Sequence, residues 1–383
     1  MSVTTPKGFR AAGVAAGIKN SGKPDVAVVI NEGPSKAAAA VFTSNRVKAA
    51  PVRWSELAVA DGQISAVVLN SGGANACTGP EGYADTEQTA VHLAGLLEVS
   101  PGDIAVCSTG LIGQRLPMHQ LLVGVDAATV AASPAGGASA ATAIMTTDTV
   151  AKTTAISGTG YRIGGMAKGA AMLAPALATM LVVITTDADV AASDLDKALR
   201  AATRSTFDRL DSDGCMSTND TVIVLASGAS GVQPDPGEFA ELLTVTCDDL
   251  AHQLLLDAEG ATKAISVQVV GADSEQDALT VGRAVARSNL LKCAITGEDP
   301  NWGRVLAAVG TTDAVFESDQ LNVAINGVWV CRNGGPGEDR SGVDLKPKDV
   351  TITVDLSAGP AAATITTTDL TAAYVHENSA YST

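Results

Sequence analysis

The feature that most limits how this chain can fold is a set of short apolar runs, rich in valine and isoleucine, that recur along its length. Uncharged runs of this kind are typical of strands that are buried on both faces of a sheet. Segments with the periodicity of amphipathic helices lie between several of them. Strands are predicted at 26–30, 64–69, 104–107, 180–184, 221–225, 265–270, 321–325 and 350–354, and helices at 86–97, 192–206, 238–256, 274–287 and 301–309.

The strands and helices alternate irregularly and nothing repeats at a fixed period, which argues against solenoids and barrels of equal units. The expected fold class is therefore mixed α/β. With 383 residues, 46% of them hydrophobic, the chain can form two or three compact units. Glycine and proline cluster at 227–237, so we expect a catalytic core over 1–235 and a smaller α/β unit over 240–383. Two further stretches, 133–139 and 333–339, have the composition of linkers.

The charge and the cysteine content limit which kinds of molecule the protein is expected to bind. The formal net charge is −16, and an acidic surface repels nucleic-acid phosphates and anionic lipids. Small-molecule substrates are therefore expected. The six cysteines are scattered without a CxxC motif, and no short His/Cys cluster has the spacing of zinc ligands. These features, with no apolar leader at the N-terminus, predict a cytoplasmic protein with reduced thiols and no metal site.

The uncharged stretch 169–186 is just long enough to span a membrane. It contains Pro175 and several threonines, and its second half is β-branched, so a buried turn followed by a buried strand fits it better. Thr179 lies where the turn gives way to the strand.

A threonine at this point has a chemical use. Its hydroxyl can attack the carbonyl of Ala178, and an N-to-O acyl shift with hydrolysis then makes Thr179 a new N-terminus. An α-amino group has a pKa of about 7.7–8.0, so it can act as the base that activates the hydroxyl of the same residue. Threonine also starts many ordinary strands, and the residues alone leave the choice open.

The segment around Thr179 resembles the processing site of the bacterial glutamate N-acetyltransferases, also called ornithine acetyltransferases, of arginine biosynthesis. It departs from the usual pattern at Ala171, where glycine is more common. The matching residues are Lys168, Gly169, Met172, Pro175, Ala178, Thr179, Met180 and Leu181. Further blocks similar to this family occur in order at 41–45, 70–76, 108–113, 143–148, 217–220, 260–263, 297–304 and 377–383.

This resemblance implies a layered α/β sandwich of the ornithine acetyltransferase and self-processing aminopeptidase type. Cleavage between Ala178 and Thr179 would give an alpha fragment, 1–178, and a beta fragment, 179–383. Strands of both would share one sheet, with Thr179 starting an inner strand, and two copies of each fragment would form a heterotetramer.

The resemblance also implies roles for single residues. Thr179 is the expected nucleophile, and Thr109 with Gly110 forms the oxyanion hole. The remaining implied residues bind substrate: Thr146 and Lys168 contact the amino acid, Glu259 pairs with an ammonium group, and Asn378 with Thr383 closes the pocket from a tail that folds back.

The implied reaction is a ping-pong transfer of acetyl from N-acetylornithine to glutamate. No bound cofactor is implied. Acetyl-CoA is used as a co-substrate by some members of the family, and no residue decides whether it is used here. Two other classes stay open: a self-processed hydrolase, whose acyl-enzyme reacts with water, and a non-catalytic interaction or membrane protein. The acidic loop that contains Asp213, Asn219 and Asp220 lacks the spacing of an EF-hand.

Overall fold

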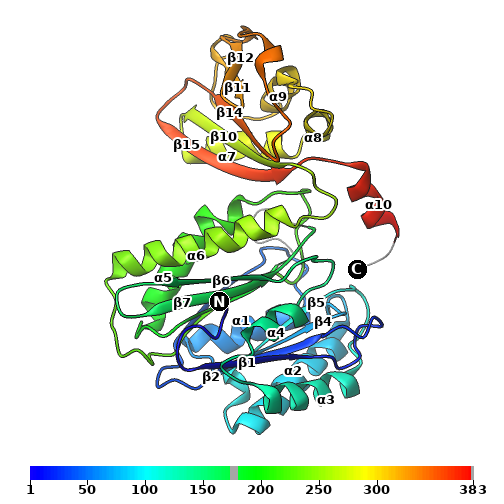
Figure 1. Ribbon diagram of the computed structural model, residues 1–383, viewed down its shortest axis with the longest axis vertical. Coiled ribbons are helices and arrows are strands. Elements are labelled where there is room, and N and C mark those ends of the chain that lie inside the picture. The colour runs from blue at the N-terminus through cyan, green and yellow to red at the C-terminus, as the bar shows by residue number, and fades with distance from the viewer. Residues whose placement is uncertain (173–179, 381–383) are drawn as a thin grey trace.

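The structure is a computed structural model that describes residues 1–172 and 180–380. Its larger part contains two sheets between layers of helices, and a smaller part with one further sheet lies beside it (Figure 1). The predicted mixed α/β class is confirmed.

The central sheet of the larger part has five strands in the order β3-β9-β8-β7-β6. The middle strand, β8, is buried at every residue because it has a strand on each side and packed layers above and below. It runs antiparallel to β7 and parallel to β9. The strands are β3 (Ala38–Phe42), β6 (Lys152–Ser157), β7 (Arg162–Lys168), β8 (Leu181–Thr186) and β9 (Thr221–Ala226). Strands from before and after residue 179 therefore share one sheet, as expected.

The second sheet of the larger part has four strands in the order β1-β2-β4-β5. One face packs against α2 (Gly79–Leu97) and α3 (Met118–Ala131), and the other shares a core with the five-stranded sheet. Helix α4 (Gly137–Ala143) contributes to that shared core, and α1 (Ala50–Ala58) packs against β5. The strands are β1 (Phe9–Val14), β2 (Val26–Asn31), β4 (Ala66–Ser71) and β5 (Ile104–Thr109).

Helices α5 (Ala192–Ser205) and α6 (Pro236–Leu256) cover the outer face of the five-stranded sheet (Figure 1). Apolar residues of α6, such as Leu243 and Leu250, lie in the same core as the strands. The sequence predicts the smaller unit to begin at residue 240, but the packing of α6 places this helix with the larger part.

The smaller part is a six-stranded sheet in the order β13-β12-β11-β14-β10-β15, packed against three helices. A last helix, α10 (Ala372–Ala380), runs from it back toward the larger part (Figure 1). The other elements are β10 (Ala264–Ala272), α7 (Glu275–Ala286), α8 (Asn289–Thr296), α9 (Trp302–Val309), β11 (Asn322–Ile325), β12 (Val328–Arg332), β13 (Gly335–Pro336), β14 (Asp349–Asp355) and β15 (Ala361–Thr368). Short 3-10 turns lie at Val59–Asp61, Pro101–Asp103, Phe207–Arg209, Ser318–Gln320 and Arg340–Gly342.

All eight predicted strands are present, but neither predicted linker connects two units. Helix α4 starts at Gly137, inside the stretch 133–139, because its alanines pack under β1. Gly335 and Pro336 pair with β12 as a short hairpin strand inside the stretch 333–339. Small residues in these two places allow close packing and a tight turn.

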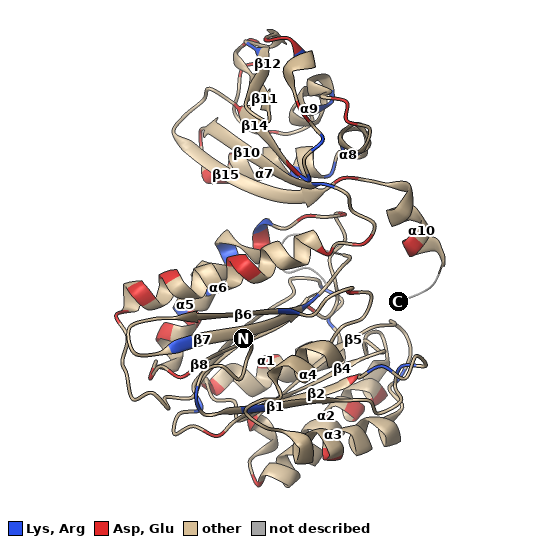
Figure 2. Cartoon of the chain, in the orientation of Figure 1, with Lys and Arg blue, Asp and Glu red and all other residues tan. Residues whose placement is uncertain are grey.

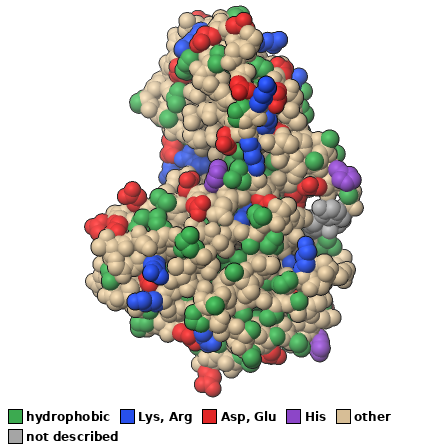
Figure 3. All heavy atoms as spheres, in the orientation of Figure 1, with side chains coloured by type: hydrophobic (Ala, Val, Ile, Leu, Met, Phe, Trp, Pro, Cys, Tyr) green, Lys and Arg blue, Asp and Glu red, His purple; other side chains and the backbone are tan. Residues whose placement is uncertain are grey.

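Charged residues of both signs occur in both parts of the chain (Figure 2). On α6, for example, Glu241, Asp248 and Asp249 are exposed. On the face shown in Figure 3, apolar side chains are scattered, and the outline of the molecule is narrower between the two parts. Among the helices of 1–172 and 180–380, none is long and apolar enough to cross a membrane.

Candidate active site

One pocket collects predicted site residues from five separate places in the chain. It is formed where β5 and β7 end, by the loops after α4 and before β9, by the segment after α6, and by α10. Ala170, Ala171 and Met172, at the edge of the undescribed segment 173–179, also line it. The predicted residues in this pocket are Thr109, Gly110, Thr146, Lys168, Glu259 and Asn378. Ala178, Thr179 and Thr383 lie outside the described residues.

Thr109 ends β5, and Gly110 begins the turn that follows it. The Thr109 carbonyl accepts hydrogen bonds from the amides of Gly72 and Gly73, at 2.9 and 3.0 Å. Gly110 has a φ of 129°, and a Cβ atom there would lie 2.6 Å from the Gly73 nitrogen. Only glycine fits this position. The close approach brings the Gly110 backbone to the pocket wall.

Lys168 ends β7, and 2% of the residue is exposed. Its Nζ donates to the Oγ1 atom of Thr109 at 3.2 Å, so the hydroxyl hydrogen of Thr109 is free to be donated elsewhere. Burial lowers the pKa of Lys168, and the carboxylate of Asp148 opposes that shift. A buried ammonium beside a pocket favours an anionic ligand, such as a carboxylate.

Asp148, which was not predicted as a site residue, holds the backbone of Thr146 and of Gly169, the residue after Lys168. Its Oδ2 atom accepts the Thr146 amide at 2.9 Å, and its Oδ1 atom accepts the Gly169 amide at 2.7 Å. The fully buried Lys152 donates to the same Oδ1 at 2.7 Å and to Asp257 at 2.5 Å. Burial raises the pKa of Asp148, but the ammonium groups of Lys168 and Lys152 lower it to about 2. This carboxylate is therefore ionised and fixes the backbone on both sides of the pocket.

Glu259 and Asn378 meet across the pocket. Glu259 follows α6, and its amide donates to the Ala170 carbonyl at 2.8 Å. Its Oε2 accepts a hydrogen bond from the Asn378 side-chain amide at 2.9 Å. Helix α10 also makes a long hydrogen bond from the Tyr374 hydroxyl to Asp213, at 3.5 Å. The predicted return of the C-terminal tail is thus present as far as residue 380.

The loop before β9 forms another wall through Ser217, Thr218 and Asn219. The Asn219 amide donates to the carbonyls of Ala74 and Ser108, at 2.6 and 2.8 Å, which ties this loop to the end of β5. Asp220, the next residue, is fully buried. The sequence singles out 217–220 as a block similar to the family, but it assigns these residues no role in the site.

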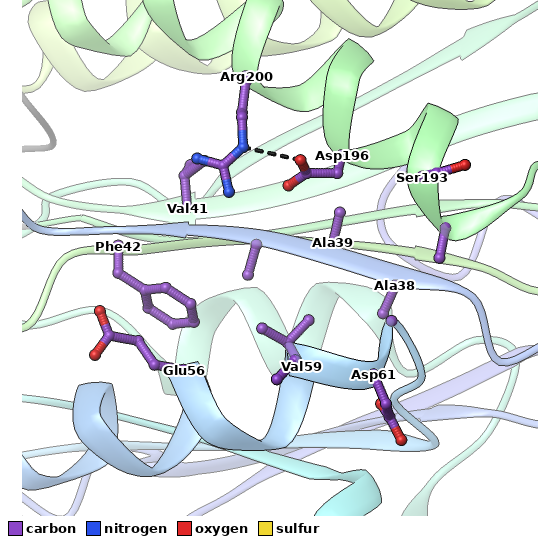
Figure 4. A pocket seen from close by; sticks show the side chains of 14 residues that line it. Ala38, Ala39, Val41, Phe42, Glu56, Val59, Asp61, Ser193, Asp196 and Arg200 are labelled. Carbon is purple, nitrogen blue, oxygen red and sulfur yellow. Dashed lines mark hydrogen bonds and ion pairs between the residues drawn. The ribbon is translucent and has the colours of Figure 1, made fainter.

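A second cavity, of about 700 Å³, lies away from these residues, between β3, α1 and α5 (Figure 4). Alanines of β3 lie between the two helices, and Arg200 on α5 pairs with Asp196 at 2.9 Å. The predicted site residues that the structure describes are not among those lining it. Within the described ranges, no group of three or more His, Cys, Asp or Glu side chains is placed to hold a metal ion.

Fold and pocket together define a class: a layered α/β protein whose pocket presents a buried ammonium, a carboxylate and a hydroxyl, the groups needed to hold an amino acid and polarise a carbonyl.

Residues 10–383 match the ArgJ family, and the chain belongs to that family. The family expected from the motifs is thereby confirmed. Two relatives, from Thermobifida fusca and Streptomyces coelicolor, are both named arginine biosynthesis bifunctional protein ArgJ. They are 70% and 65% identical over 383 and 382 residues, and each match covers 100% of this chain and of the relative.

A solved chain of ornithine acetyltransferase complexed with ornithine, from Mycobacterium tuberculosis, is 54% identical with a TM-score of 0.45. That match covers 47% of this chain and 96% of the solved one.

Proposed function

We propose that this protein transfers the acetyl group of N-acetylornithine to glutamate, giving ornithine and N-acetylglutamate. The proposal includes cleavage between Ala178 and Thr179 and an acetyl ester on the Thr179 hydroxyl. The observation that carries it is the convergence of Thr109, Lys168 and Glu259 in one pocket beside residue 172, at the edge of the segment that holds the proposed nucleophile.

The first half of the reaction is attack of the Thr179 oxygen on the acetyl carbonyl. The Thr179 amino group takes the hydroxyl proton, the bond from the carbonyl carbon to the ornithine nitrogen breaks, and the proton passes to the leaving amine. The Thr109 hydroxyl and the Gly110 amide are the proposed donors to the oxyanion. Loss of one such donor typically slows acyl transfer by about 10²–10³-fold.

The second half is attack of the glutamate amine on the acetyl ester, which restores the Thr179 hydroxyl. In both halves, Lys168 and Thr146 hold the amino-acid carboxylate and Glu259 pairs with an ammonium group. Asn378 supports Glu259, to which it is hydrogen bonded at 2.9 Å. Thr383 is proposed to close the pocket from the end of the tail.

The proposal also covers the second acetyl donor, the cofactors and the assembly of the fragments. Acetyl-CoA serves as a second acetyl donor to glutamate, in keeping with relatives named bifunctional. No other cofactor takes part. The protein works in the cytoplasm as a heterotetramer of two alpha and two beta fragments, and native mass spectrometry tests that stoichiometry.

The test is an assay of N-acetylornithine with and without glutamate. We expect ornithine release to depend on glutamate and to be matched by N-acetylglutamate. Release of ornithine and acetate at the same rate without glutamate would instead identify a hydrolase. A parallel assay with acetyl-CoA and glutamate tests the second donor.

A further inference from the structure

Asp213 lies in the loop between the 3-10 turn Phe207–Arg209 and β9, and it has no role in the reaction as proposed so far. Its Oδ2 atom accepts a hydrogen bond from the backbone amide of Met172 at 2.7 Å. The same oxygen accepts the long hydrogen bond from the hydroxyl of Tyr374 on α10. Its Oδ1 atom accepts the amide of Cys215, within the loop, at 3.0 Å. One half-buried carboxylate therefore connects the pocket wall at Met172 to α10.

Met172 lines the pocket in a backbone conformation that is unfavourable without support. Its φ is 55°, in the left-handed region that residues with a Cβ atom rarely adopt. The residues before it are held as well, because Asp148 accepts the Gly169 amide at 2.7 Å. Met172 is the last of the described residues in this wall, and the hydrogen bond to Asp213 holds it.

Tyr374 brings the first turn of α10 to the same carboxylate. Burial raises the pKa of Tyr374, and the negative charge of Asp213 raises it further, so the phenol keeps its proton and can donate it. Further along the helix, Asn378 donates to the carbonyl of Tyr374 at 3.0 Å and to Glu259 at 2.9 Å. The position of Tyr374 therefore determines where Asn378 lies in the pocket.

The smaller part fixes the other side of the loop that carries Asp213. The guanidinium of Arg287, which follows α7, pairs with Asp211 at 2.8 Å, and Lys292 on α8 donates to the carbonyl of Ser212. Burial lowers the pKa of Lys292, and the carboxylate of Asp213 is the strongest of the charges that oppose this. Because the loop is held at these points, the carboxylate is a fixed acceptor for both groups that reach it.

We propose that Asp213 is a positioning residue for the amino-acid substrate and acts through Met172 and α10. The inference rests on the proposed function. Asp213 is not among the described residues that line the pocket. It fixes one wall by holding Met172, and by holding Tyr374 it brings Asn378 to Glu259, the proposed partner of the substrate ammonium. The two effects are coupled, because one oxygen accepts both hydrogen bonds.

The test compares Asp213→Ala, Tyr374→Phe and the double variant with Asp187→Ala as a matched control. Asp213→Ala removes both contacts, whereas Tyr374→Phe removes only the contact to α10. Asp187 is also a carboxylate whose two oxygens each accept a backbone amide, from Lys7 and Arg162 at 3.0 and 2.7 Å, but it does not line the pocket. The readouts are the Kd for ornithine by calorimetry and hydrogen exchange of the amides of α10.

We expect Asp213→Ala to raise the Kd for ornithine by about tenfold, as for the loss of one hydrogen bond to a charged group, and to speed exchange in α10. Tyr374→Phe should raise the Kd by about threefold, because its hydrogen bond is long. The double variant should stay near tenfold instead of reaching about thirtyfold, since coupled contacts do not add. Asp187→Ala should leave both readouts unchanged. An unchanged Kd in folded Asp213→Ala, or effects that multiply in the double variant, would overturn the inference.

Failure of the proposed function looks different, because the unsubstituted protein would then bind no ornithine while exchange in α10 still responds to Asp213→Ala. If Asp213→Ala does not fold, Asp213→Asn replaces it, and a Kd equal to that of the unsubstituted protein together with unchanged exchange in α10 counts against the inference. If a variant is not cut, both readouts are taken on residues 1–178 and 179–383 produced together, with the same criteria.

Discussion

Single buried polar residues determine what this pocket can bind. Lys168 could be singled out from the sequence because a lysine beside a long uncharged stretch is unusual, and it is indeed buried at the pocket wall. The carboxylate of Asp148 could not be predicted in the same way. It accepts the amide of Gly169, 21 residues further along the chain, and a single sequence does not show that these two segments are neighbours.

Replacement of Lys168 by methionine should remove the charge that holds the substrate carboxylate while keeping much of the side-chain volume. We expect kcat/KM for N-acetylornithine to fall by at least about 100-fold, since a buried charged hydrogen bond is worth about 3 kcal/mol. Steady-state kinetics on Lys168→Met measures this. The control is Lys263→Met, at a buried lysine of the smaller part that donates to backbone carbonyls such as Leu345. Equal losses in the two variants would contradict the assignment.

Asp148 should make the free energy of unfolding depend on pH in the acid range. Its pKa in the folded protein is about 2, below the ordinary value of 3.8, so its stabilising effect is complete above about pH 4 and is lost as the pH falls toward 2. The contribution is about 2 kcal/mol. Urea unfolding of Asp148→Asn and the unsubstituted protein should differ most near neutral pH, and the gap should narrow in acid. A gap that is constant with pH would show that the charge of Asp148 does not matter.

At the scale of elements, strongly periodic or β-branched segments were predictable and short or alanine-rich ones were not. Strand β8 is buried throughout and rich in β-branched residues, and it was expected within one residue of its start. Strand β3 and helix α4 consist largely of alanine. These segments lack the alternation of apolar and polar residues from which a strand or a helix face is predicted, so the packing around them determines their structure. The family resemblance predicted that the C-terminal tail, which forms helix α10, returns to the pocket. No pattern in the residues of the tail predicted this.

Helix α10 should contribute to the pocket and little to stability, because none of its residues is buried. Removal of residues 372–383 takes away Asn378, the partner of Glu259. We expect KM for N-acetylornithine to rise by about tenfold, as for the loss of one good hydrogen bond, while the midpoint of thermal unfolding changes by only a few degrees. A large drop in the midpoint would mean that α10 is part of the core.

At the scale of the whole molecule, the five-stranded sheet that both fragments share determines whether the fragments stay associated after cleavage. Strand β7 of the first fragment pairs with β8 of the second from Ile163 to Lys168, and β3 pairs with β9 from Ala38 to Phe42. Both fragments also supply the apolar core between the two sheets. The mixed α/β class followed from the sequence pattern, whereas the layering of the sheets followed only from resemblance.

The two fragments should therefore stay together after cleavage. Size-exclusion chromatography in native buffer should give one peak that contains both, and they should separate only in denaturant. Separate elution of fragments 1–178 and 179–383 in native buffer would be incompatible with the sheet pairing.

The central claim is that Thr179, freed at its amino end, carries the acetyl group. It is tested most directly by mass spectrometry of protein quenched in acid after mixing with N-acetylornithine. We expect a fragment 179–383 that is heavier by one acetyl group, with the modification on Thr179 and its loss on addition of glutamate. An uncut active chain, or an acetyl group on any other residue, would contradict the account.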